Sequence, residues 1–227
     1  MLLYLNQFRD TPAALFAYLG AFGVAFVTGI AFHEFSHAWA ANELGDATAA
    51  RQGRLSLNPI RHLDPMGTAL LLLIGFGWGK PTPVNPYNLR HGVKRGNAMV
   101  AAAGPISNFF FAALAALPIK LGLITSIASF DRIGDASGEQ ILGLFLLFIV
   151  VINVSLGVFN LIPIHPLDGF KVAVGILPNE LSRPLSNLAP WGPGILMTLI
   201  VIGWVTPFNP IGYIIGGLGS QVFKIIT

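Results

Sequence analysis

The sequence predicts an all-α integral membrane protein with about five transmembrane helices and one re-entrant segment. Of its 227 residues, 54% are hydrophobic and only 10% are charged, whereas a soluble domain has roughly 25% charged residues to keep its surface in water. The 26 glycines and 16 prolines lie inside apolar runs, which is typical of packed and broken membrane helices. A water-soluble globule is therefore excluded.

Runs without charged residues mark the expected spans, because a helix needs about 20 apolar residues to cross the bilayer core. The expected spans are residues 11–33 (continuing as helix to about residue 44), 96–119, 140–167, and a pair of short spans between Arg183 and Lys224 divided by a turn at 207–210.

The segment 65–79 is apolar but only 15 residues long, which is short for a crossing and typical of a re-entrant element. If it returns to the side it left, ten of the 13 Lys and Arg residues share one side of the membrane. Such positive charge marks cytoplasmic loops. We therefore expect a multi-pass protein of the cell membrane, with a cytoplasmic C-terminus and the N-terminus outside.

One membrane-embedded domain is expected over residues 1–227, with a core at about 12–170 and a C-terminal helical pair at about 187–225. The apolar first segment lacks a clear small-residue cleavage site, so we expect it to be retained rather than removed as a signal peptide. The absence of cysteine excludes disulfides and cysteine metal sites. A net charge of +3 gives no reason to expect nucleic acid as a partner. The lipid bilayer is the expected surrounding.

Three ionisable residues lie at the end of the first apolar span, in the sequence His33-Glu34-Phe35-Ser36-His37. A charge at membrane depth costs about 2.5–3.5 kcal/mol on insertion scales, so such residues usually mark function. Two imidazoles four residues apart share one helix face and can hold one metal ion. Glu34 points about 100° round the helix and is placed to take a proton from a metal-bound water. The alternative is a chance match to the motif on a helix face exposed to water. That alternative fails here because a helix inside the membrane has no water to solvate three polar side chains.

A catalytic zinc ion takes three protein ligands and one open position, so a third ligand must come from elsewhere in the chain. Asp168 is the first acidic residue after a long uncharged run that closes the third span. Pro163, Pro166 and Gly169 surround it and predict a bent, non-helical end to that span. Asp168 is therefore the candidate third ligand, and the alternative is a turn residue at the membrane interface.

These motifs together resemble the site-2 protease family, the intramembrane zinc metalloproteases. HEFSH matches the family's H-E-x-x-H motif, and FNLIPIHPLDG, residues 159–169, matches its N-x-x-P-x-x-x-L-D-G signature. AAAGPISNF, residues 101–109, resembles the small-residue segment of an intervening core helix, and GWGKPTPVNP, residues 77–86, resembles the re-entrant β-hairpin loop. The expected form is compact, with no PDZ or CBS domain.

The resemblance implies a three-helix catalytic core that binds one Zn²⁺ ion per chain. It implies that His33, His37 and Asp168 are zinc ligands and that Glu34 is the general base. It also implies that Asn160 holds the substrate or the oxyanion of the tetrahedral intermediate; the alternative is a hydrogen bond between membrane helices. The active site is expected near the cytoplasmic face.

The expected activity is hydrolysis of peptide bonds in locally unwound transmembrane segments of single-span membrane proteins. Pro81 to Pro86 cannot be helix, so we predict that Val84 and Asn85 clamp the unwound substrate beside residues 76–80, which present an extended edge. The alternative is a loop merely stiffened by proline. Asn108 is a further candidate for substrate binding, although its small neighbours also suit close helix packing.

Three other histidines and two other functions complete the expectations. His165 stands where an apolar residue is usual; it is a metal contact, a proton shuttle or, by default, a residue facing the cytosol. His62 and His91 lie in basic loops and are expected at the surface. A metal or proton transporter, or a non-catalytic membrane scaffold, would use the same polar cluster. The oligomeric state is not predicted.

Overall fold

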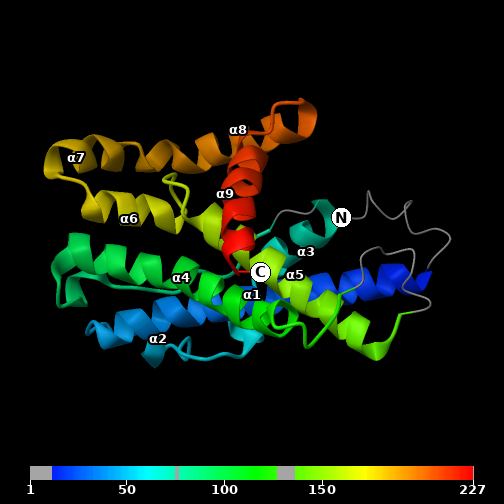
Figure 1. Cartoon of the computed structure of the whole chain (residues 1–227). Helices are drawn as coiled ribbons and strands as arrows, with labels where there is room; N and C mark the ends of the chain where they lie inside the picture. The colour runs from blue at the N-terminus through cyan, green and yellow to red at the C-terminus, as the bar shows by residue number, and fades with distance from the viewer. Residues whose placement is uncertain (1–11, 75–76, 127–135, 227) are drawn as a thin grey trace.

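The computed structural model describes residues 12–74, 77–126 and 136–226, and this part of the chain is mainly helical (Figure 1). No β-strand occurs within these ranges. The elements are α1 (Pro12–Glu43), α2 (Thr48–Arg51), η2 (Pro59–Arg61), α3 (Pro65–Ile74), η3 (Pro86–Asn88), α4 (Gly92–Lys120), α5 (Gly138–Asn160), α6 (Asp168–Ile176), α7 (Asn179–Asn187), η5 (Ala189–Trp191), α8 (Gly192–Val205) and α9 (Pro210–Ile226).

Four helical stretches of the described chain are long and apolar enough to cross a membrane. Three are α1, α4 and α5, and the fourth runs through α7, η5 and α8 as Asn179–Val205. The remaining apolar helix, α9, has 17 residues and is therefore about 26 Å long, slightly less than a bilayer core. The predicted turn at 207–210 separates α8 from α9. The prediction of an all-α, multi-pass membrane protein is thereby confirmed.

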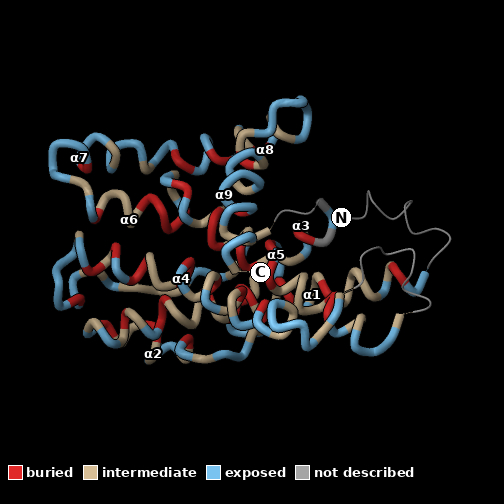
Figure 2. Tube along the Cα trace, viewed as in Figure 1, coloured by how far each residue is buried: buried red, intermediate tan, exposed pale blue. Residues whose placement is uncertain are grey.

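Three helices, α1, α4 and α5, pack against one another and form the centre of the molecule. Small residues permit this close approach: Ala112 and Ala116 of α4 meet Val150 and Val154 of α5. Helix α6 packs on α4, where the lack of a side chain at Gly175 makes room for Ala98. Helix α9 crosses α5 (Figure 1), and Figure 2 shows α7 and α8 largely exposed.

The chain before and after α3 pairs at one point. Helix α3 has 10 residues and so is only about 15 Å long. An antiparallel bridge joins Leu63 to Gly79, and the Lys80 N–H donates to the His62 carbonyl over 2.7 Å. The sequence predicts a β-hairpin here, and within the described residues this one bridge is found in its place. Residue 76, the first residue of the predicted extended edge 76–80, lies outside the described residues. The predicted surface position of His62 is wrong: His62 is buried because the two chain segments pair at this point.

The buried carboxylate of Asp46 ties the loop before α4 to the chain that follows α1. Its Oδ1 accepts hydrogen bonds from the Thr48 hydroxyl (2.5 Å), the Thr48 N–H (3.2 Å) and the Asn88 amide (2.9 Å). Its Oδ2 accepts from the Asn85 N–H over 2.6 Å. All four donors favour the charged carboxylate. This one side chain therefore fixes the course of the loop.

Replacing Asp46 by Asn is expected to cost about 1–3 kcal/mol of stability, because the new amide group meets donors. Burial raises the pKa of Asp46, but hydrogen bonds from Thr48, Asn88 and Asn85 outweigh it and lower the pKa. A lowered native pKa gives stability above the unfolded pKa of about 4 that is lost as pH falls through the native pKa. Thermal unfolding in detergent across this pH range should show a smaller acid loss in Asp46→Asn. Equal acid profiles would contradict the assignment.

Candidate metal centre

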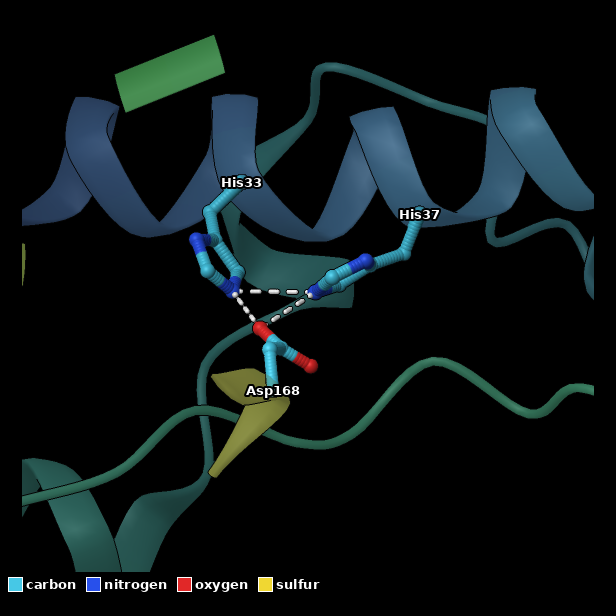
Figure 3. Close-up of side chains that lie close together, drawn as sticks. All are labelled: His33, His37 and Asp168. Carbon is cyan, nitrogen blue, oxygen red and sulfur yellow. Dashed lines mark hydrogen bonds and ion pairs between the residues drawn. The ribbon is translucent and has the colours of Figure 1, made fainter. Parts of the chain in front are cut away.

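Three buried side chains from two distant parts of the chain meet at one point (Figure 3). His33 and His37 project from one face of α1, and Asp168 is the first residue of α6. The Oδ2 of Asp168 lies 3.0 Å from the Nε2 atoms of both histidines. The two Nε2 atoms are themselves 3.0 Å apart. The three predicted metal ligands thus present one atom each to a common centre.

A chain of hydrogen bonds fixes the tautomer of His33. The Asn153 amide donates to the Ile149 carbonyl over 2.9 Å, so its oxygen is free to accept. The Asn108 amide donates to that oxygen over 2.8 Å and to the Gly29 carbonyl over 3.1 Å. The Asn108 oxygen must therefore accept the His33 Nδ1–H, at 2.7 Å. His33 Nε2 is left as a lone pair directed at the centre.

His37 is held in the same tautomer by a backbone group. Its Nδ1 lies 2.8 Å from the Val100 carbonyl, which can only accept, so Nδ1 carries the proton. In the neutral His37 ring, Nε2 then also has a lone pair directed at the centre.

Three acceptor atoms at these distances repel one another unless positive charge lies between them, supplied by a metal ion or by protons on the imidazole rings. Two ligands at 2.0–2.2 Å from one tetrahedral zinc ion would lie about 3.3 Å apart, close to the 3.0 Å spacings found. Gly104 lies directly against the two histidine rings: a Cβ there would come within 2.6 Å of His33 Nε2 and 2.5 Å of His37 Nε2. The donor set and its surroundings therefore fit zinc.

The predicted non-helical position of Asp168 is wrong, although its place beside the histidines is right. Helix α5 ends at Asn160, and Asp168 begins the new helix α6. The acidic residue in its first turn favours this start, since the helix dipole is positive there. The second carboxylate oxygen, Oδ1, lies 3.8 Å from the Lys171 ammonium group.

Glu34 and the three candidate ligands line one cavity of about 850 Å³. Its walls come from α1, α3, α4, α5, α6, α8 and α9 and from the loop before η3. Most of the wall is apolar, and a few polar side chains interrupt it. The polar residues outside the metal centre are Thr82, Asn97, Ser155, Asn160, Lys171 and Asn209.

The predicted substrate residues fall in different places. Val84 and Asn160 line the cavity, but the Asn160 amide donates to the Leu156 carbonyl of its own helix over 3.0 Å. The side chain of Asn85 accepts from the Tyr87 N–H and caps η3, and it does not reach the cavity. The Asn85 side chain therefore does not contact a substrate in the cavity, contrary to the prediction.

Asn108 is not a cavity residue either. It is fully buried behind His33, because tight packing of α1, α4 and α5 leaves its amide only protein partners. The prediction of a substrate contact is wrong. His165 is not part of the metal cluster of the described residues; its ring packs edge-on against Phe170, with centroids 5.5 Å apart.

Two residues of the site were not predicted, although the sequence carries a signal for each. Asn153 is a polar residue inside the apolar α5, which by itself indicates a buried partner. Thr82 stands between Pro81 and Pro83, so it has the one backbone N–H of that triplet. Both the N–H and the hydroxyl of Thr82 contact the Glu34 carboxylate.

Comparison with known proteins identifies relatives over most of the chain. The protein named "Putative zinc metalloprotease YwhC" of Bacillus subtilis (strain 168) is 32% identical over 197 residues, which cover 87% of this chain and 86% of the relative. This chain belongs to the site-2 protease family. It is therefore a metalloprotease. Among the described residues, His33, His37 and Asp168 lie close enough together to bind the metal ion.

More distant relatives agree with this assignment. The proteins named "Putative zinc metalloprotease Rip2" of Mycolicibacterium smegmatis and Mycobacterium tuberculosis (strain H37Rv) are 29% and 25% identical to the protease over 225 residues, with 92% of this chain and 82% of each relative covered. No family model matches the chain. No solved structure matches it.

Replacing Asn108 by Leu, which is similar in volume, should weaken zinc binding by about 10- to 100-fold, because the His33 Nδ1–H loses the acceptor that orients the ring. Zinc affinity is measured by competition with a chelator on the purified protein. Ser107→Ala, on the same helix, is the control: its hydroxyl bonds the Gly104 carbonyl and touches no ligand. Equal zinc affinity in the parent and Asn108→Leu would show that the relay is not needed.

Proposed function

We propose that this protease is an intramembrane zinc metalloendopeptidase that cleaves locally unwound transmembrane segments of single-span membrane proteins. The observation that carries the proposal is the meeting of His33, His37 and Asp168 with Glu34 on one cavity among apolar helices. Membership of a metalloprotease family supports the reaction, and the depth of the site between candidate membrane spans supports the class of substrate.

The polar residues of the site have different tasks in this reaction. His33, His37 and Asp168 would hold the zinc ion. When bound, zinc lowers the pKa of its water ligand toward about 7 and polarises the scissile carbonyl. Glu34 accepts the proton of the water and returns it to the amine of the leaving peptide. For Asn160 to donate to the oxyanion, its amide must first leave the Leu156 carbonyl.

The cavity favours an unwound, apolar substrate. A helical segment hides each carbonyl in a hydrogen bond to the N–H four residues on, so it must unwind before a carbonyl can reach the ligands. The wall of the cavity consists largely of aromatic and branched side chains, which suit the side chains of a membrane span. They include Phe22, Phe26, Ile30, Leu71, Ile152, Phe159, Ile200 and Trp204.

The loop from Lys80 to Asn85 has one backbone N–H left for a substrate. The N–H groups of Lys80, Thr82 and Asn85 donate to His62, Glu34 and Asp46. The N–H of Val84 has no hydrogen-bond partner in the described part of the chain, and Val84 lines the cavity. A substrate strand can therefore pair with the loop through this group.

The orientation in the membrane follows from the return of residues 65–79. The Leu63–Gly79 bridge brings together the chain before and after α3, which supports placing both segments on one side; that side would then have most of the Lys and Arg residues. By the positive-inside rule it is cytoplasmic. The ligands of α1 lie in its last third, so the active site would open near the cytoplasmic face. Arg9 and Arg132, two of the three cations assigned to the opposite side, lie outside the described residues.

The substrate pairing is tested by replacing Val84 with Pro, which removes the free N–H. We expect the KM for a single-span reporter to rise by about tenfold, the effect of roughly one hydrogen bond, with zinc content unchanged. The reporter has an apolar span of about 20 residues with a central Gly-Pro pair that unwinds it. Val84→Ala retains the N–H and should stay within about twofold of the parent. Unchanged KM in the proline variant would rule out the pairing.

The catalytic assignment is tested by separating metal binding from turnover. Glu34→Gln should retain one zinc ion per chain and lower kcat on the reporter by at least about 100-fold, because the base is lost and the ligands remain. His37→Ala and Asp168→Ala should lose both zinc and cleavage. Zinc is measured by elemental analysis and cleavage by gel. Parent-like cleavage by Glu34→Gln would exclude Glu34 as the base.

A further inference from the structure

A carboxylate that acts as a general base must point one oxygen at the proton it takes. Glu34 follows the ligand His33 on α1, and its side chain is only partly buried, so packing alone does not fix its orientation. Contacts from outside α1 must therefore fix the orientation of the Glu34 side chain. The described structure has one residue that makes them, Thr82.

Thr82 binds one of the two oxygens of the Glu34 carboxylate. The Thr82 N–H and the Thr82 hydroxyl each donate to Oε2 over 2.8 Å. The hydroxyl also lies 3.0 Å from the Glu34 backbone carbonyl, but a charged oxygen is the stronger acceptor for its one proton. No hydrogen bond to Oε1 occurs among the described residues, and Glu34 lines the cavity. One oxygen is thus held and the other is left for chemistry.

The loop that presents Thr82 is itself fixed on both sides. Before Thr82, the Lys80 N–H donates to His62 over 2.7 Å, and the Arg54 guanidinium donates to the Lys80 carbonyl. After Thr82, the Asn85 N–H donates to Asp46 over 2.6 Å. Thr82 precedes Pro83, which restricts its backbone to extended conformations. The two donors of Thr82 are therefore already in place before substrate arrives.

Arg54 adds charge of the right sign to the same arrangement. It is buried, with an exposed fraction of 6%. Burial lowers the pKa of the Arg54 guanidinium, and the negative charge of Glu34 partly offsets this effect. The two side chains are thus within electrostatic reach of each other.

We propose that Thr82 is a positioning residue, whose hydroxyl and N–H hold Oε2 of Glu34 so that Oε1 faces the proton of the attacking water. This inference rests on the proposed role of Glu34 as the base. Thr82 touches neither the ligands nor the reacting atoms, so its effect falls on the rate of the chemical step rather than on zinc binding or substrate affinity.

The first test removes the hydroxyl and leaves the shape. Thr82→Val is isosteric and keeps the N–H, so we expect the kcat of the zinc-loaded full chain on the Gly-Pro reporter to fall about tenfold, with KM within about twofold of the parent. Thr82→Ser restores the hydroxyl on a smaller side chain and should return kcat to within about twofold. A purely structural role predicts the opposite order, because Val fills the site better than Ser. Equal kcat in the Val variant and the parent overturns the proposal.

The second test does not depend on turnover. Hydrogen exchange at the Thr82 amide should be at least about tenfold faster in Glu34→Ala than in the parent, because that N–H loses its acceptor. The Asn85 amide, which Asp46 holds, is the internal control and should not change. Unchanged exchange at Thr82 overturns the contact. Full activity of Glu34→Gln would instead overturn the role of Glu34, while an inactive Glu34→Gln with a normal Thr82→Val would refute only the positioning.

Discussion

Three acceptor atoms held 3.0 Å apart are the constraint on which this structure depends. Lone pairs so close repel one another, and low-dielectric surroundings strengthen that repulsion. Only positive charge converts the arrangement from unfavourable to favourable, which links metal binding to the stability of the packed helices. The fold therefore has to position acceptors against their own repulsion, and Asn108, Asn153 and the Val100 carbonyl serve that purpose.

The packing of the helices follows from the same requirement. Each histidine must send its Nδ1–H away from the centre, and inside apolar helices the acceptor has to be protein. Helix α4 supplies both acceptors, the Asn108 side chain and the Val100 carbonyl, and α5 supplies Asn153 to complete the first. Close approach of α1, α4 and α5 is thus needed for the chemistry as well as for packing, and Gly104 permits it at the ligands themselves.

The sequence predicts what depends on helical period and fails where tertiary contacts decide. The spacing of His33 and His37 sets one helix face whatever the fold, and uncharged runs locate the spans. The sequence places Asp168 correctly beside them but does not predict its helix, because Pro163, Pro166 and Gly169 around it indicate a break rather than the start of α6. The roles of Asn108 and Thr82 depend on partners 75 and 48 residues away, and no local pattern indicates those distances. His62 was misplaced for the same reason.

The loop from Lys80 to Asn85 links the base to the proposed substrate site through its backbone geometry. Lys80, Thr82 and Asn85 each precede a proline, which favours extended backbone at each of them. In an extended chain, N–H groups two residues apart point to the same edge. The free N–H of Val84 therefore faces the edge at which Thr82 meets Glu34. A substrate strand bound through Val84 would lie along that edge, and the residues that orient the base would then also set the register of the peptide bond to be cleaved.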